Sequence, residues 1–323
     1  MSTSIARSIC VTLLLACPSV AALAATPADY PSRQIRMLIP FQPGGSTDIL
    51  ARVVATHLGQ AWSQQVVPDN RPGANGIIAA EILTKSAADG HTLLFVAMGH
   101  AINSLIYRKL PYDTERDFTP VSLAALYSQL VLVHPSVPAR SVKELIALAR
   151  AKRMTYASGG VGSSQHLAGA LFSHMAKIDM SHVPYKGGAP GLVDVIAGNV
   201  EMMITQPTSV EQIKAGRLRA LAISSPKRSP LWPDVPTVSE AGLAGYQSEA
   251  WYGLVAPRNL PPDVLKKLND ETVRALRAPA LKDMLAISGG TPVGSTPAEF
   301  GTFIKAEINR YTKVVKDAGI SAD

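Results

Sequence analysis

Two stretches of this sequence combine glycines with small hydroxyl side chains, a combination suited to binding an anion. One lies at 43–48 and the other at 158–164. Glycine lets the backbone approach a ligand closely, and a helix start carries unpaired N–H groups and partial positive charge. We therefore expect each stretch to favour a carboxylate, with an ordinary strand-to-helix turn as the alternative. The side chains concerned are Ser46, Thr47, Asp48, Ser163 and Ser164.

The three residues that close the first stretch are of types that accept hydrogen bonds from first-turn N–H groups, so we expect them to cap a helix beginning near Ile49. Thr47 is expected to donate a hydrogen bond to the ligand. Asp48 would repel a carboxylate at close range, so its expected role is to order a water or to meet an ammonium group.

Further polar candidates follow predicted strands. Residues 98–103 are predicted to form a loop after the strand 92–97, and His100 there is either a ligand contact or a surface histidine. His166 either lines the site or is an ordinary helix histidine. Lys186 either contributes positive electrostatic potential at the ligand site or is a solvated loop lysine. Gln206 ends another short apolar run and is placed at a strand terminus.

Catalytic motifs are missing from the sequence. The glycine loop has Gln165 where a dinucleotide fingerprint needs its third glycine, and there is no Walker loop and no His-Glu-x-x-His. The 162–166 stretch lacks the last glycine of a nucleophile elbow, and the histidines show no metal spacing. We therefore predict binding loops without a catalyst, cofactor or metal, although a carboxylate pair assembled in three dimensions stays open.

The first 24 residues have the features of a secretory signal peptide. Arg7 precedes an apolar run, and Ala22-Leu23-Ala24 forms an Ala-x-Ala cleavage site. Both cysteines, Cys10 and Cys17, lie in this segment, so the mature protein should have neither disulfide nor thiolate chemistry. Leu14 to Cys17 resembles a lipobox, which makes lipid anchoring the second choice. A periplasmic location is expected.

The remaining chain is long enough for two domains of ordinary size. The full sequence has the 47% hydrophobic content of a globular protein and only 6% aromatics, and its net charge of +7, which becomes +6 without Arg7, is scattered. This pattern disfavours nucleic-acid binding and is compatible with a small anionic ligand.

Strands alternating with helices predict parallel sheets, whose ligands bind at the carboxyl ends of the strands. Extended runs at 121–133 and 248–256 are predicted to cross between the domains. We expect domain 1 at 25–128 and 248–323 and domain 2 at 129–247.

Several ordered motifs resemble the Bug family, the periplasmic receptors of tripartite tricarboxylate transporters. They span most of the mature chain: Tyr30-Pro31, Pro40-Phe41-x-Pro43-Gly44-Gly45-x-x-Asp48, Asn70-Arg71-Pro72-Gly73-Ala74, Ala88-Asp89-Gly90-x-Thr92-Leu93-Leu94, Gly162-Ser163-x-x-His166-Leu167 and Val183-Pro184-Tyr185-Lys186-Gly187.

The resemblance implies two doubly wound α/β domains joined by two crossover segments, as in type II periplasmic binding proteins that close like a flytrap. It also implies a small carboxylate ligand (a di- or tricarboxylate, an acidic amino acid or an aromatic acid) and a two-subunit membrane permease as partner. Loops equivalent to 41–48, 99–103 and 162–166 would hold the ligand. With the candidates above, the expected site comprises Phe41, Gly45, Ser46, Thr47, Asp48, Asn75, Gly99, His100, Asn103, Gly162, Ser163, Ser164, His166, Tyr185, Lys186 and Gln206.

The sequence departs from the family pattern at two cleft-facing places. Asn75 stands where glycine or alanine is usual, and 204–207 replaces a more familiar Phe-Asp-Asn-Leu-Pro. Ligand identity is therefore open. Two other functions also stay open: a secreted α/β hydrolase or lyase with a site assembled in the cleft, and a solute sensor that serves a signalling partner such as a sensor kinase.

Overall fold

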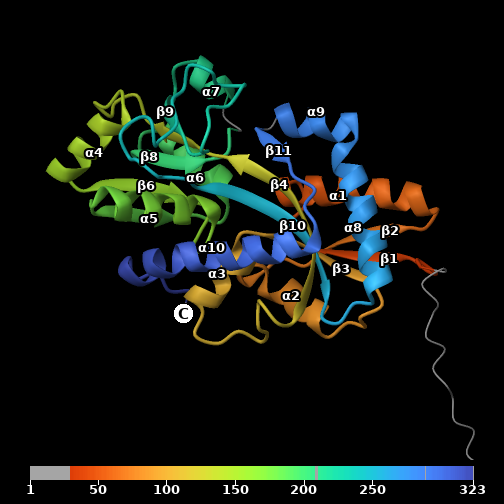
Figure 1. Ribbon diagram of the computed structural model, residues 1–323. Coiled ribbons are helices and arrows are strands. Elements are labelled where there is room, and N and C mark those ends of the chain that lie inside the picture. Colours follow the sequence, from red (N-terminus) through yellow and green to blue (C-terminus); the bar gives the residue numbers. More distant parts are fainter. Residues whose placement is uncertain (1–29, 208–209, 288, 323) are drawn as a thin grey trace, which may run out of the picture.

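The chain forms two α/β lobes connected by two long strands (Figure 1). This computed structural model describes residues 30–207, 210–287 and 289–322. The predicted signal peptide, with both cysteines, lies outside the described residues. The lobe-1 sheet has the strand order β11-β4-β10-β3-β1-β2, and the lobe-2 sheet has the order β7-β6-β8-β5-β9.

Lobe 1 is assembled from both ends of the described chain, so its N- and C-terminal elements share one core. Its N-terminal elements are β1 (Ile35–Ile39), α1 (Ser46–Trp62), β2 (Val66–Asn70), a 3-10 turn (Ala74–Gly76), α2 (Ile77–Thr84), β3 (Thr92–Ala97), α3 (Gly99–Ile106) and β4 (Phe118–Ser128). Its C-terminal elements are β10 (Glu249–Pro257), α8 (Pro262–Arg277), α9 (Pro279–Ile287), β11 (Gly290–Pro292) and α10 (Pro297–Asp317).

Lobe 2 is formed by the intervening segment and has the same strand–loop–helix units. Its elements are β5 (Leu130–Val133), α4 (Val142–Ala151), β6 (Met154–Ser158), α5 (Ser164–Ala176), β7 (Met180–Pro184), α6 (Gly188–Ile196), β8 (Met202–Thr205), α7 (Val210–Lys214) and β9 (Arg219–Ile223). The predicted strand–glycine loop–helix unit at 154–176 is present as β6 and α5.

Both sheets are mixed rather than wholly parallel as predicted. The βα units pair in parallel, as β1 does with β2 and β3, and β6 with β7 and β8. The strands at the crossovers, β4, β10 and β5, pair antiparallel. The two crossovers enter and leave lobe 2 side by side, so they must run in opposite directions.

The two crossovers meet at one ladder position. Glu249 of β10 pairs with Ser128 of β4, and just beyond this pair Ser224 N–H donates to Gln129 O over 2.8 Å. Gln129 is fully buried. We propose that the domains divide here, with 25–128 and 248–323 in one domain and 129–247 in the other.

Helix α10 packs against both lobes, with α3 and β4 on one side and α5 on the other (Figure 1). Its start has a capping box formed by Thr296 and Glu299. Phe300 of α10 lies directly over Gly253 of β10, where an added Cβ would approach the ring to 2.3 Å. The helix therefore sits close to the central strand only because that strand has no side chain at residue 253.

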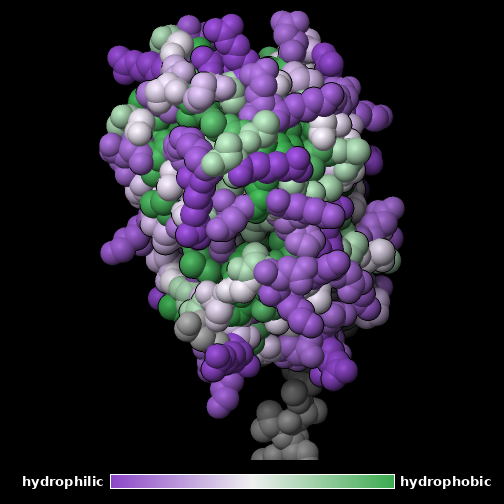
Figure 2. Space-filling view, turned by 90° about the vertical axis from the view of Figure 1, so that its left-hand side faces the viewer, coloured by the Kyte–Doolittle hydropathy of each residue, from purple (hydrophilic) through white to green (hydrophobic). Residues whose placement is uncertain are grey.

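The surface is mainly polar. Hydrophilic side chains cover most of the face shown in Figure 2, with hydrophobic groups visible between them. Among the described residues, no helix combines the length and apolar character needed to span a membrane.

We predict that Gly253→Ala lowers the free energy of unfolding by about 1–3 kcal/mol, because the new methyl group forces the Phe300 ring to shift. Urea denaturation of Gly253→Ala, Phe300→Leu and the double variant measures this. The double variant should lose less than the sum of the single losses. Gly301→Ala, where the added Cβ meets nothing closer than 3.6 Å, is the matched control, and additive losses would contradict the close contact.

Candidate functional site

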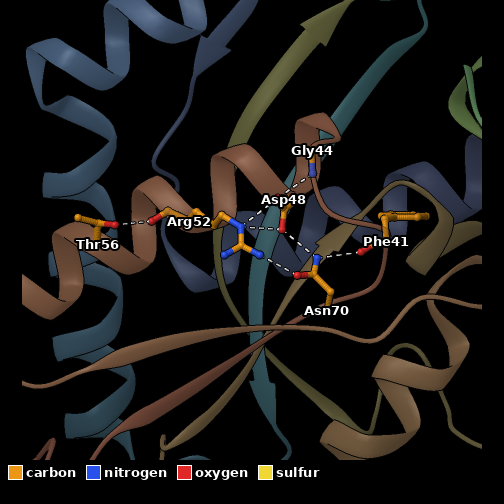
Figure 3. Close-up of polar contacts among 6 residues, drawn as sticks. All are labelled: Phe41, Gly44, Asp48, Arg52, Thr56 and Asn70. Carbon is orange, nitrogen blue, oxygen red and sulfur yellow. Dashed lines mark hydrogen bonds and ion pairs between the residues drawn. The ribbon is translucent and has the colours of Figure 1, made fainter. Parts of the chain in front are cut away.

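The 40–48 loop is held in shape by one buried carboxylate, that of Asp48 (Figure 3). It accepts hydrogen bonds from the Gly44 N–H (2.9 Å), from Arg52 Nε (2.9 Å) and from Asn70 Nδ2 (2.8 Å). Asn70 also donates to the Phe41 carbonyl over 2.9 Å and accepts from Arg52 Nη2 over 2.8 Å. These contacts join both ends of the loop to β2 and α1.

The Asp48 carboxylate is charged, but its charge is balanced. Burial works to raise its pKa, whereas the hydrogen bonds from Arg52, Gly44 and Asn70 lower it, and their combined effect leaves the pKa below its usual range. The Arg52 guanidinium forms an ion pair with it. Because Asp48 is already neutralised inside lobe 1, it offers little repulsion to an anion at the helix start.

Helix α1 begins earlier than predicted, and the expected caps are wrong. It starts at Ser46, its N-cap is Gly45, and no side chain accepts a hydrogen bond at this cap. Asp48 instead binds the N–H of Gly44, one residue before the cap. Glycine at the N-cap leaves the first-turn N–H groups of α1 without a side-chain acceptor, which keeps them available for an anion.

The start of α5 is organised differently. Ser163 is its N-cap, and the Ser163 hydroxyl accepts from the His166 N–H over 3.3 Å. Ser164, the first helical residue, has its hydroxyl 3.4 Å from Gln129 Nε2. Gln129 Oε1 is buried and has no hydrogen-bond partner among the described residues. An unpaired buried acceptor therefore lies beside the start of α5, at the point where the chain enters lobe 2.

The His166 side chain stabilises the glycine loop by a hydrogen bond. Its Nδ1 accepts from the Gly162 N–H over 3.2 Å, and its ring stacks on His182 with centroids 3.8 Å apart. Burial lowers the pKa of His166 to about 3, with a further contribution from His182, and burial lowers that of His182 to about 4. Both rings are therefore neutral near pH 7, and His166 supports the loop as a neutral acceptor.

Two sets of contacts connect the lobes through predicted site residues. Ser46 donates to Gln206 Oε1 over 3.1 Å, and Gln206 Nε2 donates to the Tyr252 hydroxyl over 2.8 Å. Asn75 Nδ2 donates to Asn103 Oδ1 over 2.9 Å and lies 3.5 Å from the Gly162 carbonyl. The start of α1 and the loop before α5 therefore each lie where the two lobes touch.

Asn75 occupies a tight position in this cleft. Its backbone is left-handed, with φ 51°. A Cβ on Gly99 would lie 2.6 Å from Asn75 Nδ2, and one on Gly162 would lie 2.9 Å from the same atom. Glycine at both places is what gives the Asn75 carboxamide its room.

The other predicted site residues are placed as follows. Residues 99–103 are not a loop as predicted but the first turns of α3, and His100 and Asn103 are buried there. Phe41 is half-buried and lines a cavity with Asn75 and His100. Thr47 is buried beside the Tyr252 hydroxyl. In lobe 2 the Tyr185 hydroxyl binds Asp194 on α6, and Lys186 is exposed.

Sequence reasoning missed Arg52, Asn70, Gln129 and Tyr252. Only Gln129 gave a visible signal, because it interrupts an apolar extended run. Asn70 and Tyr252 act through contacts between segments that are distant in sequence, whereas Arg52 pairs with Asp48 one helical turn away.

One pair in lobe 2 has the geometry of a serine nucleophile and its base. Ser158 Oγ lies 2.5 Å from His182 Nε2. However, Ser158 is fully buried, and its hydroxyl also accepts from the Gly160 N–H over 3.0 Å. The pair therefore stabilises the glycine loop through the bond to Gly160. It does not serve as a nucleophile and base, since a substrate cannot reach this hydroxyl. The described residues contain no cluster of three or more His, Cys, Asp or Glu side chains placed to hold a metal ion.

The fold and the cleft define a two-lobed solute-binding protein. A family model described as "Tripartite tricarboxylate transporter family receptor" matches residues 50–320. Protein BugT of Bordetella pertussis is 37% identical over 295 residues, which cover 90% of each chain.

Two solved structures from Rhodopseudomonas palustris are also similar. Rpa4515 with adipate is 39% identical with a TM-score of 0.82, and the match covers 91% of this chain and 99% of that one. MatC with bound malate is 33% identical with a TM-score of 0.77, and the match covers 88% and 100%. The chain belongs to the tripartite tricarboxylate transporter receptor family, which confirms the predicted family and the two-domain fold.

We predict that Asp48→Asn lowers the free energy of unfolding by about 1–3 kcal/mol at pH 7, because buried donors lose a charged acceptor. Urea denaturation measures the loss. The difference from wild type should disappear as the pH falls through the lowered pKa, where wild-type Asp48 is itself protonated. Asp270→Asn, which breaks an exposed ion pair with Lys266, should cost less than about 0.5 kcal/mol. Equal losses in the two variants would contradict a special role for Asp48.

The histidine stack predicts a pH dependence of stability. The unfolded chain binds protons on histidine near pH 6.5, whereas folded His166 stays neutral to about pH 3. Stability is therefore full above pH 6.5 and falls as the pH decreases, by about 1.4 kcal/mol per pH unit for such a group. Urea midpoints between pH 7.5 and 5.5 test this. His166→Gln should flatten the profile, whereas His174→Gln, outside the stack, should not.

Proposed function

We propose that this protein is a periplasmic receptor that captures a small carboxylate between its lobes and delivers it to a two-subunit membrane permease. One observation carries the proposal: the start of α1 and the loop before α5 each lie where the two lobes touch, and the α1 start has no side-chain cap. Two partial positive charges would converge there on one anion. The receptors of the matched family are periplasmic, and structures of two relatives hold the carboxylates adipate and malate.

The ligand's carboxylate would be held by backbone N–H groups rather than by a cation. The interlobe contacts use Ser46, Gln206, Tyr252 and Asn75, which carry no charge, and Asp48 is paired with Arg52. Oriented amides in a partly dry cleft bind an anion without the cost of burying a second ion.

The protein is further proposed to bind its ligand without transforming it. The buried Ser158–His182 pair is the nearest approach to a nucleophile and base in the described site, and it is out of a substrate's reach. Incubation of purified protein with each ligand, followed by NMR of the small molecules, should show the compounds unchanged. Turnover of any of them would favour the hydrolase or lyase alternative. Transport that persists without the protein, together with loss of a signalling response, would favour the sensor alternative.

We predict that at least one compound in a panel of dicarboxylates, hydroxy acids, acidic amino acids and aromatic acids raises the melting temperature. At about 1,000 times its Kd, a ligand stabilises the folded state by about 4 kcal/mol. Differential scanning fluorimetry with a matched panel of amines and sugars as controls measures this. Stabilisation by none of the acids would contradict the proposed function.

A proline substitution tests the backbone N–H groups directly. Ser164 is the first residue of α5, where proline fits, and Ser163 before it has the extended backbone that proline requires (φ −68°, ψ 157°). Ser164→Pro should weaken carboxylate binding about tenfold or more through loss of one charge-assisted hydrogen bond. Ser164→Ala keeps the N–H and controls for the hydroxyl. Equal affinities of the two variants in calorimetry would argue against amide binding at α5.

A further inference from the structure

A small cavity lies in lobe 1 and is lined by residues of that lobe alone. It has about 250 Å³ of empty space, and the part that could take the centre of a water-sized group is about 10 Å³. That is room for about one water molecule or a polar end group of similar size. We call this cavity the lobe-1 pocket; its polar lining residues are Asn75, His100, Asn103 and Tyr112.

Two polar groups of the lobe-1 pocket are buried without a hydrogen-bond partner among the described residues. They are His100 Nε2 and the Tyr112 hydroxyl, on side chains that are 6% and 8% exposed. The Tyr112 hydroxyl lies near Asn103 but forms no hydrogen bond of normal geometry with it. Leaving such a group unpaired costs about 1–3 kcal/mol. Both atoms therefore need a polar partner from outside the protein.

The two rings are held firmly in place. The rings of His100 and Tyr112 both pack edge-on against Phe118, with centroids 4.7 and 5.2 Å away. His100 also lies on α3, whose first residue Gly99 is packed against Asn75. The unpaired atoms are thus fixed features of lobe 1 rather than freely rotating groups.

The lobe-1 pocket has no charge to balance an anion. None of its lining residues is Lys, Arg, Asp or Glu. Burial lowers the pKa of His100 to about 4, so its imidazole is neutral near pH 7. The remaining lining is apolar: Pro40, Phe41, Leu94, Val96 and Ala97. A carboxylate placed here would be desolvated without a counter-ion, whereas a hydroxyl or carboxamide can both donate and accept.

Asn75 connects the pocket to the cleft. It lines the pocket, donates to Asn103, and faces the Gly162 carbonyl of lobe 2 across the cleft. A ligand gripped at the helix starts would pass Asn75 to reach the unpaired atoms behind it.

We infer that the lobe-1 pocket binds the uncharged far end of the ligand, a hydroxyl or carboxamide on a chain whose other end is the carboxylate. This inference rests on the proposed function, and it narrows the substrate class to acids with one charge and one neutral polar terminus. His100 and Tyr112 then determine specificity, because they complete their hydrogen bonds only with such an end group.

Four acids of equal chain length test the inference: 6-hydroxyhexanoate, the monoamide of adipate, adipate and hexanoate. Calorimetry at pH 7.5 should show the hydroxy acid or the monoamide binding at least tenfold more tightly than adipate and than hexanoate. Tyr112→Phe removes one unpaired hydroxyl and keeps the ring, so it should reduce this preference several-fold. His100→Asn is the second variant. Tyr246→Phe removes a buried hydroxyl of lobe 2 that binds the Ala168 carbonyl, and it should leave the preference intact.

The outcomes separate the two proposals. If neither these four acids nor any acid of the fluorimetry panel binds, the proposed function fails, and if another acid binds but none of these four does, the pocket assignment fails alone. If adipate binds as tightly as the neutral-ended acids, or if both Tyr112→Phe and His100→Asn keep the full preference, the pocket assignment is overturned while the receptor function stands.

Discussion

The site depends first on the buried carboxylate of Asp48. Its three donors come from the loop before α1, from the next turn of α1 and from the end of β2, so a single charge fixes the position of a glycine-rich loop that has little stiffness of its own. Because Arg52 neutralises this charge, the start of α1 keeps its favourable potential for an anion. The same residue thus organises the loop and avoids opposing the ligand that the loop is proposed to bind.

The hydrogen bonds that join the lobes near the start of α1 are made by uncharged side chains. Hydrogen bonds such as those of Ser46 and Gln206 contribute about 0.5–1.5 kcal/mol each, much less than the free energy released by a tightly held ligand. Such contacts can orient the lobes without locking them together. Helix α10, which packs against α3 and β4 of lobe 1 and against α5 of lobe 2, also joins the lobes.

Much of the fold could be predicted from patterns within short segments of the sequence. Residues 92–97 form the predicted strand, because an apolar run of strand length is a property of a short segment. The start of α1 differs from the predicted one, because Gly45 is the N-cap and the Asp48 carboxylate accepts a hydrogen bond from the Gly44 N–H. Residues 99–103 form a helix because Ala101, Ile102 and Ile106 bury one face in the core, which outweighs the glycine and polar residues that favoured a loop.

The contacts of Asn75, Gln129 and Tyr252 depend on segments that meet only in the folded chain, so the sequence contained no short-range sign of them. Which side chains complete the cleft was accordingly the least predictable part.

The place of β10 in the lobe-1 sheet has a consequence for the order of assembly. This strand lies between β4 and β3 at the centre of the sheet, yet it follows lobe 2 in the chain. During synthesis the two halves of the sheet therefore have no shared strand until residues beyond 248 have emerged. A chain whose central strand is made late cannot complete its first lobe until the last quarter of the chain is available.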